Sequence, residues 1–457
     1  MKKITVGSVC SGIEAASVGL PKEFYEMKWF SEIADFPSRL LKESYPNIPN
    51  HGDMCDIPEK IVSSEADSTD LICGGTPCQA FSFAGWKEGL SDERGNLTLK
   101  FIDIIEKNDF VRKLNGKSSS FVLWENVEGV LRDKTNAFGS FISSLIGVET
   151  VLNFNKWNNA GFIHGPKRNV AWRVIDAKYF GLPQQRKRLF VLASDTKYFP
   201  ENILFDYFPD TIPTYNNDNL SFVKNNHSFE VFRSYTDCLY TAYGTKWNGN
   251  AAAYNGSLFI AQNNRLRRIT PLECERLMGF PDNYTNLEGA KRTNRYQALG
   301  NSWAIPVVRW IGDRLEGEIR TPRTSVLKEC SHTQSTKLEI TPSLSCYFPS
   351  IKIITKNNSD LFSPVINGTP IPQNPEIGDI KKIIDCNPEE KLYISPTGCM
   401  GIIRRKHERN VKINPRLEFH LKNISSTIPI TEIEKISRIQ PRGKDSYVSL
   451  KKLKKQK

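Results

Sequence analysis

The chain has 457 residues and a net charge of +12, a length that allows two or three domains with cores of their own. Its ten cysteines form no Cys-x-x-Cys pair and no cluster with histidine at metal-ligand spacing, which argues against zinc and against a disulfide scaffold. No stretch approaches the roughly 18 apolar residues of a membrane span, and the N-terminus lacks the apolar core of a signal peptide. We therefore expect a soluble, cytoplasmic protein without metal or membrane partners.

The basic charge is concentrated at one end of the chain. Residues 320–457 hold 25 Lys and Arg against 13 Asp and Glu, so the remainder of the chain is neutral overall. A basic extension on a neutral body suggests a tether to a polyanion, although a tail of ordinary solvated lysines explains the charge equally well.

The N-terminal segment has the pattern of a nucleotide-binding fold. A β-rich run at residues 4–9 leads into a turn containing Gly12 and then into a helix, a layout that offers backbone N–H groups to an anion. Glu32 ends the next apolar run, 20 residues after Gly12, about the offset at which such folds place an acid on ribose hydroxyls. Asp53 could accept from an adenine amino group. Together the acids favour an adenosine-type cofactor.

Two further strand ends carry reactive side chains. The apolar run 70–73 enters a glycine turn that places Cys78 on a loop at the carboxyl edge of the sheet, where a thiol can serve as nucleophile. The run 120–124 leads directly to Glu125, whose pKa an apolar wall would raise. The basic turn at residues 181–188 suits phosphate or base-edge contacts, or is simply solvated.

The rest of the chain divides into four segments of different composition. Residues 195–264 are rich in Asn and aromatics and contain Asn-Gly turn signals, which predicts a small hairpin-rich domain. Residues 265–319 return to helical patterns and complete the domain formed by residues 1–194. Residues 320–380 are rich in Ser, Thr, Pro and Asn and predict a linker. Residues 381–457 form a basic helical extension, with helix starts at Ser395-Pro396 and Asn414-Pro415.

The order of these motifs resembles the DNA cytosine-5 methyltransferases over roughly residues 4–315. The resemblance rests on five separated motifs: Thr76-Pro77-Cys78-Gln79, Glu125-Asn126-Val127, Gln184-x-Arg186-x-Arg188, Thr270-Pro271 through Gly279-Phe280-Pro281, and Gly300-Asn301-Ser302. It implies an α/β fold with a Rossmann-like S-adenosylmethionine-dependent methyltransferase sheet. To that sheet are joined a small, mostly β target-recognition domain and the basic C-terminal extension.

The resemblance also implies roles for the residues in these motifs. Cys78 would attack C6 of a flipped-out cytosine and Glu125 would protonate N3, while Arg188 would bind the cytosine O2 and Arg186 the loop or a nearby phosphate. The S-adenosyl-L-methionine site would contain Cys10, Gly12, Ile13, Glu32, Asp53, Pro77, Asn301 and Ser302. Contacts with DNA would come from Gln79, Ala84, Gln184, Thr241, Thr245 and Lys246.

Three positions depart from the family pattern. Cys10 stands where the family usually has Phe, Glu14 where it has Gly, and Met278 where it has Gln. We expect Glu14 to point away from the cofactor or to cap the following helix, and Met278 to be structural.

The resemblance implies a monomeric enzyme acting on double-stranded DNA in a bacterium or a phage-infected cell, with or without a cognate restriction enzyme. Two other interpretations stay open. An RNA cytosine-5 methyltransferase would share the fold, but residues 195–264 favour the reading of duplex sequence. A non-catalytic DNA-binding regulator would have no need of Cys78 together with Glu125.

Overall fold

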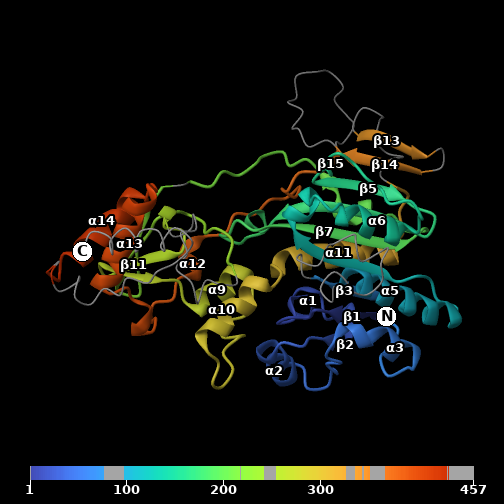
Figure 1. Cartoon of the computed structure of the whole chain (residues 1–457), viewed down its shortest axis with the longest axis horizontal. Coiled ribbons are helices and arrows are strands. Elements are labelled where there is room, and N and C mark those ends of the chain that lie inside the picture. Colours follow the sequence, from blue (N-terminus) through green and yellow to red (C-terminus); the bar gives the residue numbers. More distant parts are fainter. Residues whose placement is uncertain are drawn as a thin grey trace, which may run out of the picture. The chain divides into compact units, whose positions relative to one another are not determined.

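The computed structural model describes residues 2–76, 97–216, 218–240, 254–325, 335–341, 344–349, 366–429 and 431, and the chain forms two compact units (Figure 1). The first unit comprises Met1–Asn216, Tyr235–Lys246 and Pro271–Ile384, and the second Asn217–Ser234, Trp247–Thr270 and Asp385–Lys457. Residues 195–216 and 235–246, which we expected in the target-recognition domain, thus belong to the first unit.

The first unit is built on a nine-stranded mixed sheet in the order β13-β14-β5-β6-β7-β4-β3-β1-β2. Its parallel part contains β1 (Ile4–Val9), β2 (Tyr25–Ser31), β3 (Leu71–Gly74) and β4 (Phe121–Val127). Its antiparallel part contains β5 (Ala160–His164), β6 (Arg168–Asp176), β7 (Lys187–Asp195), β13 (Ser335–Thr341) and β14 (Leu344–Pro349). The predicted α/β class with a large sheet is confirmed.

Both faces of this sheet are covered, because side chains alternate between the faces along each strand. In β4, Val122 and Trp124 enter one hydrophobic cluster, and Phe121 and Leu123 enter the other. The first cluster includes side chains of α3 (Ile57–Val62), α5 (Leu97–Leu114) and α6 (Ala137–Ile146). The second includes side chains of α1 (Ala15–Gly19), α7 (Glu201–Leu204) and α11 (Ile305–Arg320). Cores on both faces hold the strand ends in fixed positions.

Further short elements complete the first unit. Helix α9 lies where the sequence predicts it, from the N1 proline Pro271 to the residue before Gly279. The remaining elements are α2 (Asp35–Ser44), α10 (Arg292–Asn301), α12 (Ile380–Ile383), η1 (Met54–Asp56), η3 (Glu128–Arg132), η4 (Ala177–Tyr179), β8 (Asp206–Tyr207) and β15 (Ile366–Asn367).

The second unit joins the predicted hairpins to the C-terminal helices. Strands β9 (Leu220–Lys224), β10 (His227–Val231), β11 (Phe259–Gln262) and β12 (Arg265–Arg268) form an antiparallel sheet. Helices α13 (Pro396–Arg409) and α14 (Pro415–Ser425) begin after the predicted caps Ser395 and Asn414, with the 3-10 turn η8 (Glu390–Leu392) before them. Phe232 and Leu266 share one hydrophobic cluster with Ile402 and Leu417. The two described helices of the basic extension therefore fold together with the hairpins.

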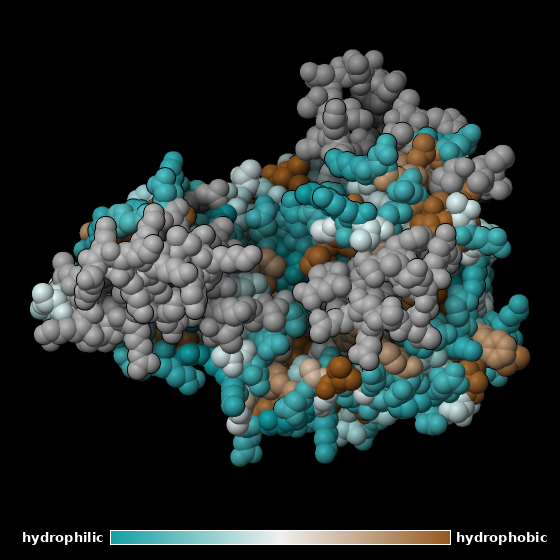
Figure 2. All heavy atoms as spheres, viewed as in Figure 1, coloured by the Kyte–Doolittle hydropathy of each residue, from teal (hydrophilic) through white to brown (hydrophobic). Residues whose placement is uncertain are grey.

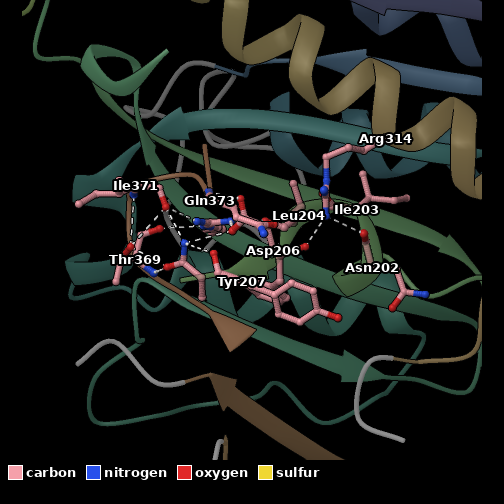
Figure 3. A network of polar contacts seen from close by, with 12 residues as sticks. Asn202, Ile203, Leu204, Asp206, Tyr207, Arg314, Thr369, Ile371 and Gln373 are labelled. Atoms are coloured by element: carbon pink, nitrogen blue, oxygen red, sulfur yellow. Dashed lines mark hydrogen bonds and ion pairs between the residues drawn. The ribbon is translucent and has the colours of Figure 1, made fainter. Parts of the chain in front are cut away.

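The predicted linker at residues 320–380 differs from what the structure shows. Strand β14 pairs with β5, and β15 pairs with β8. After β15 the chain binds Arg173, a side chain 1% exposed, whose Nε and Nη2 donate to the carbonyls of Thr369 and Ile371, each at 2.8 Å. Asp206 accepts from Arg173 Nη1 at 2.9 Å and from the Gln373 amide at 2.7 Å (Figure 3). Polar composition concealed this segment because it pairs through backbone groups.

Hydrophobic side chains on the face seen in Figure 2 lie in small separate groups among hydrophilic ones. The most exposed large apolar side chain of the described residues is Ile33, at 75%. Among the described helices, none combines the length and hydropathy of a membrane span.

We predict that a chain ending at Arg320 is destabilised, because the buried guanidinium of Arg173 loses the carbonyls of Thr369 and Ile371. Each hydrogen bond to a charged group contributes about 1.5–3 kcal/mol, so the loss should reach about 3 kcal/mol or more. Urea unfolding followed by circular dichroism measures it. A chain ending at Thr431 keeps all these contacts and serves as the control; equal unfolding midpoints would contradict the prediction.

Candidate active site

Several of the predicted site residues that the structure describes lie at one edge of the large sheet. Parallel strands β1, β2 and β3 end there and are followed by the Cys10 turn, Glu32 and Gly75, and the parallel strand β4 ends there with the Glu125 motif itself. Strand β7 is antiparallel to β4 and begins at the same edge, so that Arg188 lies opposite Val127 and Phe190 opposite Glu125. Open α/β sheets bind their ligands at this edge.

The turn after β1 is hydrogen-bonded to the carboxylate of Glu32. Gly12 has a φ of +55°, and a Cβ built on it meets no atom within 4 Å. Its amide donates to Glu32 Oε2 at 2.8 Å, and Glu32 Oε1 accepts from the Ala34 amide at 2.7 Å. The 20-residue spacing thus places Glu32 directly beside the glycine turn.

Cys10 and Asp53 lie in the same neighbourhood. Burial, together with the negative charges of Glu32 and Asp53, raises the pKa of the Cys10 thiol to about 12. The thiol contacts Met54 Sδ at 3.6 Å, and Asp53 caps η1 by accepting from the Cys55 amide at 2.9 Å. Cys10 is therefore a neutral, weakly polar wall of this site.

Glu14, one of the three departures from the family pattern, caps α1 as expected. Its carboxylate accepts from the Ser17 amide at 2.9 Å and contacts the hydroxyls of Ser8 and Ser17. The side chain is only 1% exposed, and burial raises its pKa. These serine partners keep the carboxyl group inside the molecule.

Glu125 forms the second centre of the site. It is 8% exposed, and Arg188 Nε lies 3.0 Å from its Oε1. Burial raises the pKa of Glu125, while the charges of Arg188 and Arg186 and a hydrogen bond with Trp303 oppose the rise. A Cβ on Gly75 would lie 3.4 Å from both Glu125 Oε2 and Trp303 Nε1. A carboxyl group in this setting keeps its proton to a higher pH than a solvent-exposed glutamic acid does.

Thr76 is fixed beside Glu125 by side chains of β4. Trp124 Nε1 donates to the Thr76 hydroxyl at 3.1 Å, and Asn126 Nδ2 donates to the Thr76 carbonyl at 3.0 Å. The two neighbours of Glu125 in sequence thus anchor the chain two residues before Cys78. The described residues end here and resume at Leu97.

Arg186 and Gln184 are both buried against backbone groups. Arg186 thus contacts a loop, one of its two expected partners, and not a phosphate, whereas Gln184, expected to contact DNA, has no exposed surface. Arg186 is 2% exposed and donates to the carbonyls of Gly300 at 3.0 Å and Ser302 at 2.6 Å. Gln184 is fully buried, donates to the Leu277 carbonyl at 2.9 Å and accepts from the Leu239 amide at 3.0 Å. Both side chains satisfy buried backbone groups, which fixes the loop that carries Arg188.

The structure adds neighbours that the motifs do not reveal. Tyr284 donates to the carbonyl of Ile13 at 2.8 Å, and Cys238 Sγ lies 3.1 Å from Arg186 Nη1 and 3.6 Å from Arg188 Nη2. Trp303 follows directly after the Gly300-Asn301-Ser302 motif, so its place beside Glu125 could have been suspected. The exposed side chain of Ile33 follows Glu32 and was missed, because an apolar residue at a strand end reads as core.

Several predicted site residues lie outside the described residues. They are Pro77, Cys78, Gln79, Ala84, Thr241, Thr245 and Lys246. Asn301 ends α10, and the next residue, Ser302, contributes its carbonyl to Arg186. In the described part of the chain, no three His, Cys, Asp or Glu side chains gather as metal ligands would.

A family model described as C-5 cytosine-specific DNA methylase matches residues 4–257 and 221–317. The DNA N-6-adenine-methyltransferase of Escherichia phage P1 is 30% identical over 74% of this chain and 64% of its own length. The type II methyltransferase M2.BsuMI of Bacillus subtilis is 27% identical over 68% of this chain and 75% of its own. The S. pombe Dnmt2 methyltransferase structure gives a TM-score of 0.45 at 16% identity, covering 70% of this chain and 100% of that one.

We predict that Arg186→Ala lowers the free energy of unfolding by about 3 kcal/mol or more, because the carbonyls of Gly300 and Ser302 lose a charged donor inside the protein. Denaturant unfolding measures this loss. Lys187→Ala removes the exposed neighbouring cation and should change stability by less than about 0.5 kcal/mol. Equal effects of the two substitutions would show that the hydrogen bonds of buried Arg186 do not stabilise the fold.

Proposed function

The chain belongs to the C-5 cytosine-specific DNA methylase family, and we propose that it transfers a methyl group from S-adenosylmethionine to C5 of a cytosine in duplex DNA. The observation that carries the proposal is the pairing of buried Glu125 with Arg188, next to the anchored Thr76. Two residues of extended chain span at most about 7 Å, so Cys78 must lie within that reach of Thr76. The thiol and the carboxyl group can therefore act on one base.

The paired side chains suit the edge of a cytosine ring. A protonated Glu125 can donate to N3, and Arg188 can donate to O2. Protonation at N3 makes C6 electrophilic, so the Cys78 thiolate can add there and convert C5 into an enamine carbon that takes the methyl group. Loss of the C5 proton and departure of Cys78 Sγ then restore the ring. Because neighbouring bases block both ring faces, the cytosine must flip out, at a cost of a few kcal/mol.

The residues around Gly12 fit an adenosine-type methyl donor. Glu32 lies beside an open glycine turn, and Asp53 lies close enough to affect the same thiol as Glu32. Ile33, directly after Glu32, leaves an apolar surface that the face of an adenine ring could cover. When bound, S-adenosylmethionine supplies an electrophilic methyl group on its sulfonium sulfur. The protein's part is to bind the nucleoside and to exclude water.

Adenine N6 is a second candidate acceptor, because the phage P1 relative is named as an N-6-adenine-methyltransferase. An exocyclic amino group needs no thiol addition to the ring, whereas Glu125 paired with Arg188 matches the N3 and O2 edge of cytosine. The site therefore favours cytosine.

We predict that the protein converts cytosine to 5-methylcytosine in DNA, that Cys78→Ser abolishes the transfer, and that Glu125→Gln slows it by about 10²–10⁴-fold. Mass spectrometry of hydrolysed DNA separates 5-methylcytosine from N6-methyladenine, and tRNA serves as the RNA substrate. Methylation of adenine alone or of tRNA alone would overturn the proposal, as would full activity of Cys78→Ser. Bisulfite sequencing then identifies the target site.

The raised pKa of Glu125 predicts the pH dependence of the rate. A raised pKa keeps the carboxyl group protonated above the usual ~4.3 of glutamic acid, and the rate should fall once the pH passes that raised value. Single-turnover methylation of wild-type protein should show this descending limb at high pH. The amide of Glu125→Gln has no titrating proton, so this variant should lack the descending limb. A descending limb retained in the variant would show that another group causes it.

We further propose that the whole second unit reads the DNA sequence, with α13 and α14 as part of it. Arg416 Nε and Nη2 donate to the two carboxylate oxygens of Glu230, each at 2.7 Å, and His420 Nε2 lies 2.9 Å from Glu230 Oε2. This bidentate pair and the shared core fix α14 on the hairpin sheet. The helices thereby support the strands flanking residues 241–253.

Leu417→Ala should weaken site-specific DNA binding, because emptying a fully buried leucine site costs about 2–5 kcal/mol in the core that supports the hairpins. S-adenosylmethionine binding, assigned to the first unit, should be unchanged. Fluorescence anisotropy measures DNA binding and calorimetry measures cofactor binding. Asn423→Ala, at an exposed side chain on the same helix, is the control. Equal DNA affinity of both variants would separate α14 from recognition.

A further inference from the structure

The loop that carries the arginines is bound by two segments distant in sequence. This arginine loop, residues 177–188, runs from the end of β6 through the first two residues of β7. On one side, the Thr236 amide donates to the Pro183 carbonyl and the Gln185 amide donates to the Thr236 carbonyl, each at 2.8 Å. On the other, the Gly181 amide donates to the Glu376 carbonyl and the Glu376 amide to the Tyr179 carbonyl, each at 2.9 Å.

Gly378 brings the second segment into direct contact with the loop backbone. A Cβ built on Gly378 would lie 2.4 Å from Pro183 N, 2.5 Å from the carbonyl carbon of Leu182 and 2.6 Å from the Gly181 oxygen. All three are main-chain atoms, so a side chain here would have to displace the arginine loop or the segment itself. Only glycine permits this approach.

Tyr215 ties the two backbones together at the same point. Its hydroxyl accepts from the Gly378 amide at 3.0 Å and lies 2.7 Å from the Lys178 carbonyl and 3.2 Å from the Leu182 carbonyl. Burial raises the pKa of Tyr215 to about 12, so the hydroxyl keeps the proton it donates to these carbonyls.

The same segment also contacts α9, the helix to which the arginine loop is hydrogen-bonded. Arg276 of α9 donates through Nη1 to the carbonyls of Ile383 at 3.0 Å and Ile384 at 3.2 Å. Gln184 of the arginine loop donates to the Leu277 carbonyl of α9 at 2.9 Å. Residues 376–384, the bracing segment, therefore contact the loop directly and through α9.

We infer that the bracing segment is a positioning element of the active site, which holds the arginine loop so that Arg188 stays paired with Glu125. The segment lies beyond residue 317, where the match to the family model ends, and its residues touch no reacting atom. Arg188 is four residues from Gln184 and two from the clamped Arg186, so a shift of the braced backbone displaces its guanidinium. This inference rests on the proposed methyl transfer, because it assigns Arg188 the cytosine O2.

Gly378→Ala and Tyr215→Phe test the inference in the full-length protein. Gly378→Ala forces the two backbones apart, and Tyr215→Phe removes only one hydroxyl and keeps the ring. We expect faster hydrogen exchange at the amides of Gly181, Gln185 and Arg186 in both variants. The single-turnover methylation rate should fall about tenfold or more, because small misplacements of a binding group slow reactions strongly. The Kd for S-adenosylmethionine should stay at the wild-type value.

The matched control is Gly317→Ala in α11, where a built Cβ meets nothing within 4 Å. The inference is overturned if both variants show the same hydrogen-exchange rates in residues 177–188 as the control. It is also overturned if their methylation rates equal that of the control. If Gly378→Ala does not fold, Tyr215→Phe decides alone. A wild-type protein that methylates no cytosine refutes the proposed function, and hydrogen exchange then still decides whether the segment braces the loop.

Discussion

One buried guanidinium holds the proposed active site together. Arg186 donates to the carbonyls of Gly300 and Ser302, and its own amide donates to Asp176 Oδ1 at 3.0 Å. A guanidinium carries five N–H donors in a planar fork, so one side chain can satisfy carbonyls from several segments. Burial of this charge is costly unless those carbonyls are in place. The loop before β7 and the end of α10 are thereby fixed relative to each other, and with them Arg188 and Trp303, which both contact Glu125.

Arg186 and Arg188 are only two residues apart, but their surroundings differ strongly. Residues two apart in a strand-like segment point to the same side, but Arg186 lies where the loop is covered by residues 238–239 and 300–302, whereas Arg188 is at the open edge beside Glu125. Arg186 binds backbone carbonyls and Arg188 contacts Glu125 directly, while the charges of both oppose the rise in the pKa of Glu125 that burial causes. Burial and the two cations thus act in opposite directions on the proton of this carboxyl group.

The sequence alone predicted the parts of the site that depend on local pattern. The end of β1, the N1 proline of α9 and the caps Ser395 and Asn414 all follow from spacing and capping rules. Strand β4 instead continues to Val127, so Glu125 lies within the strand and not after the predicted run 120–124. What the sequence could not predict was which side of each motif faces solvent. Gln184 and Arg186 are polar and were interpreted as ligand contacts, but their partners include the carbonyls of Leu277 and Gly300, which lie 93 and 114 residues further along the chain. Such long-range contacts leave no periodic trace in a sequence.

The C-terminal third shows the same limit in a different form. Its charge suggested an appendage, because composition reports the solvated faces of helices and hides their apolar ones. Cys399, Ile402 and Ile403 nevertheless recur at helical spacing, as do Ile413, Leu417 and Leu421, and both sets are buried against the hairpin strands. Residues 366–384, in contrast, contain only one short set at this spacing, Ile380, Ile383 and Ile384. They bind the rest of the first unit largely through Arg173 and through the backbone at Gly378. A segment that pairs by main-chain groups and close glycine approach can be essential to a site while its composition remains that of a linker.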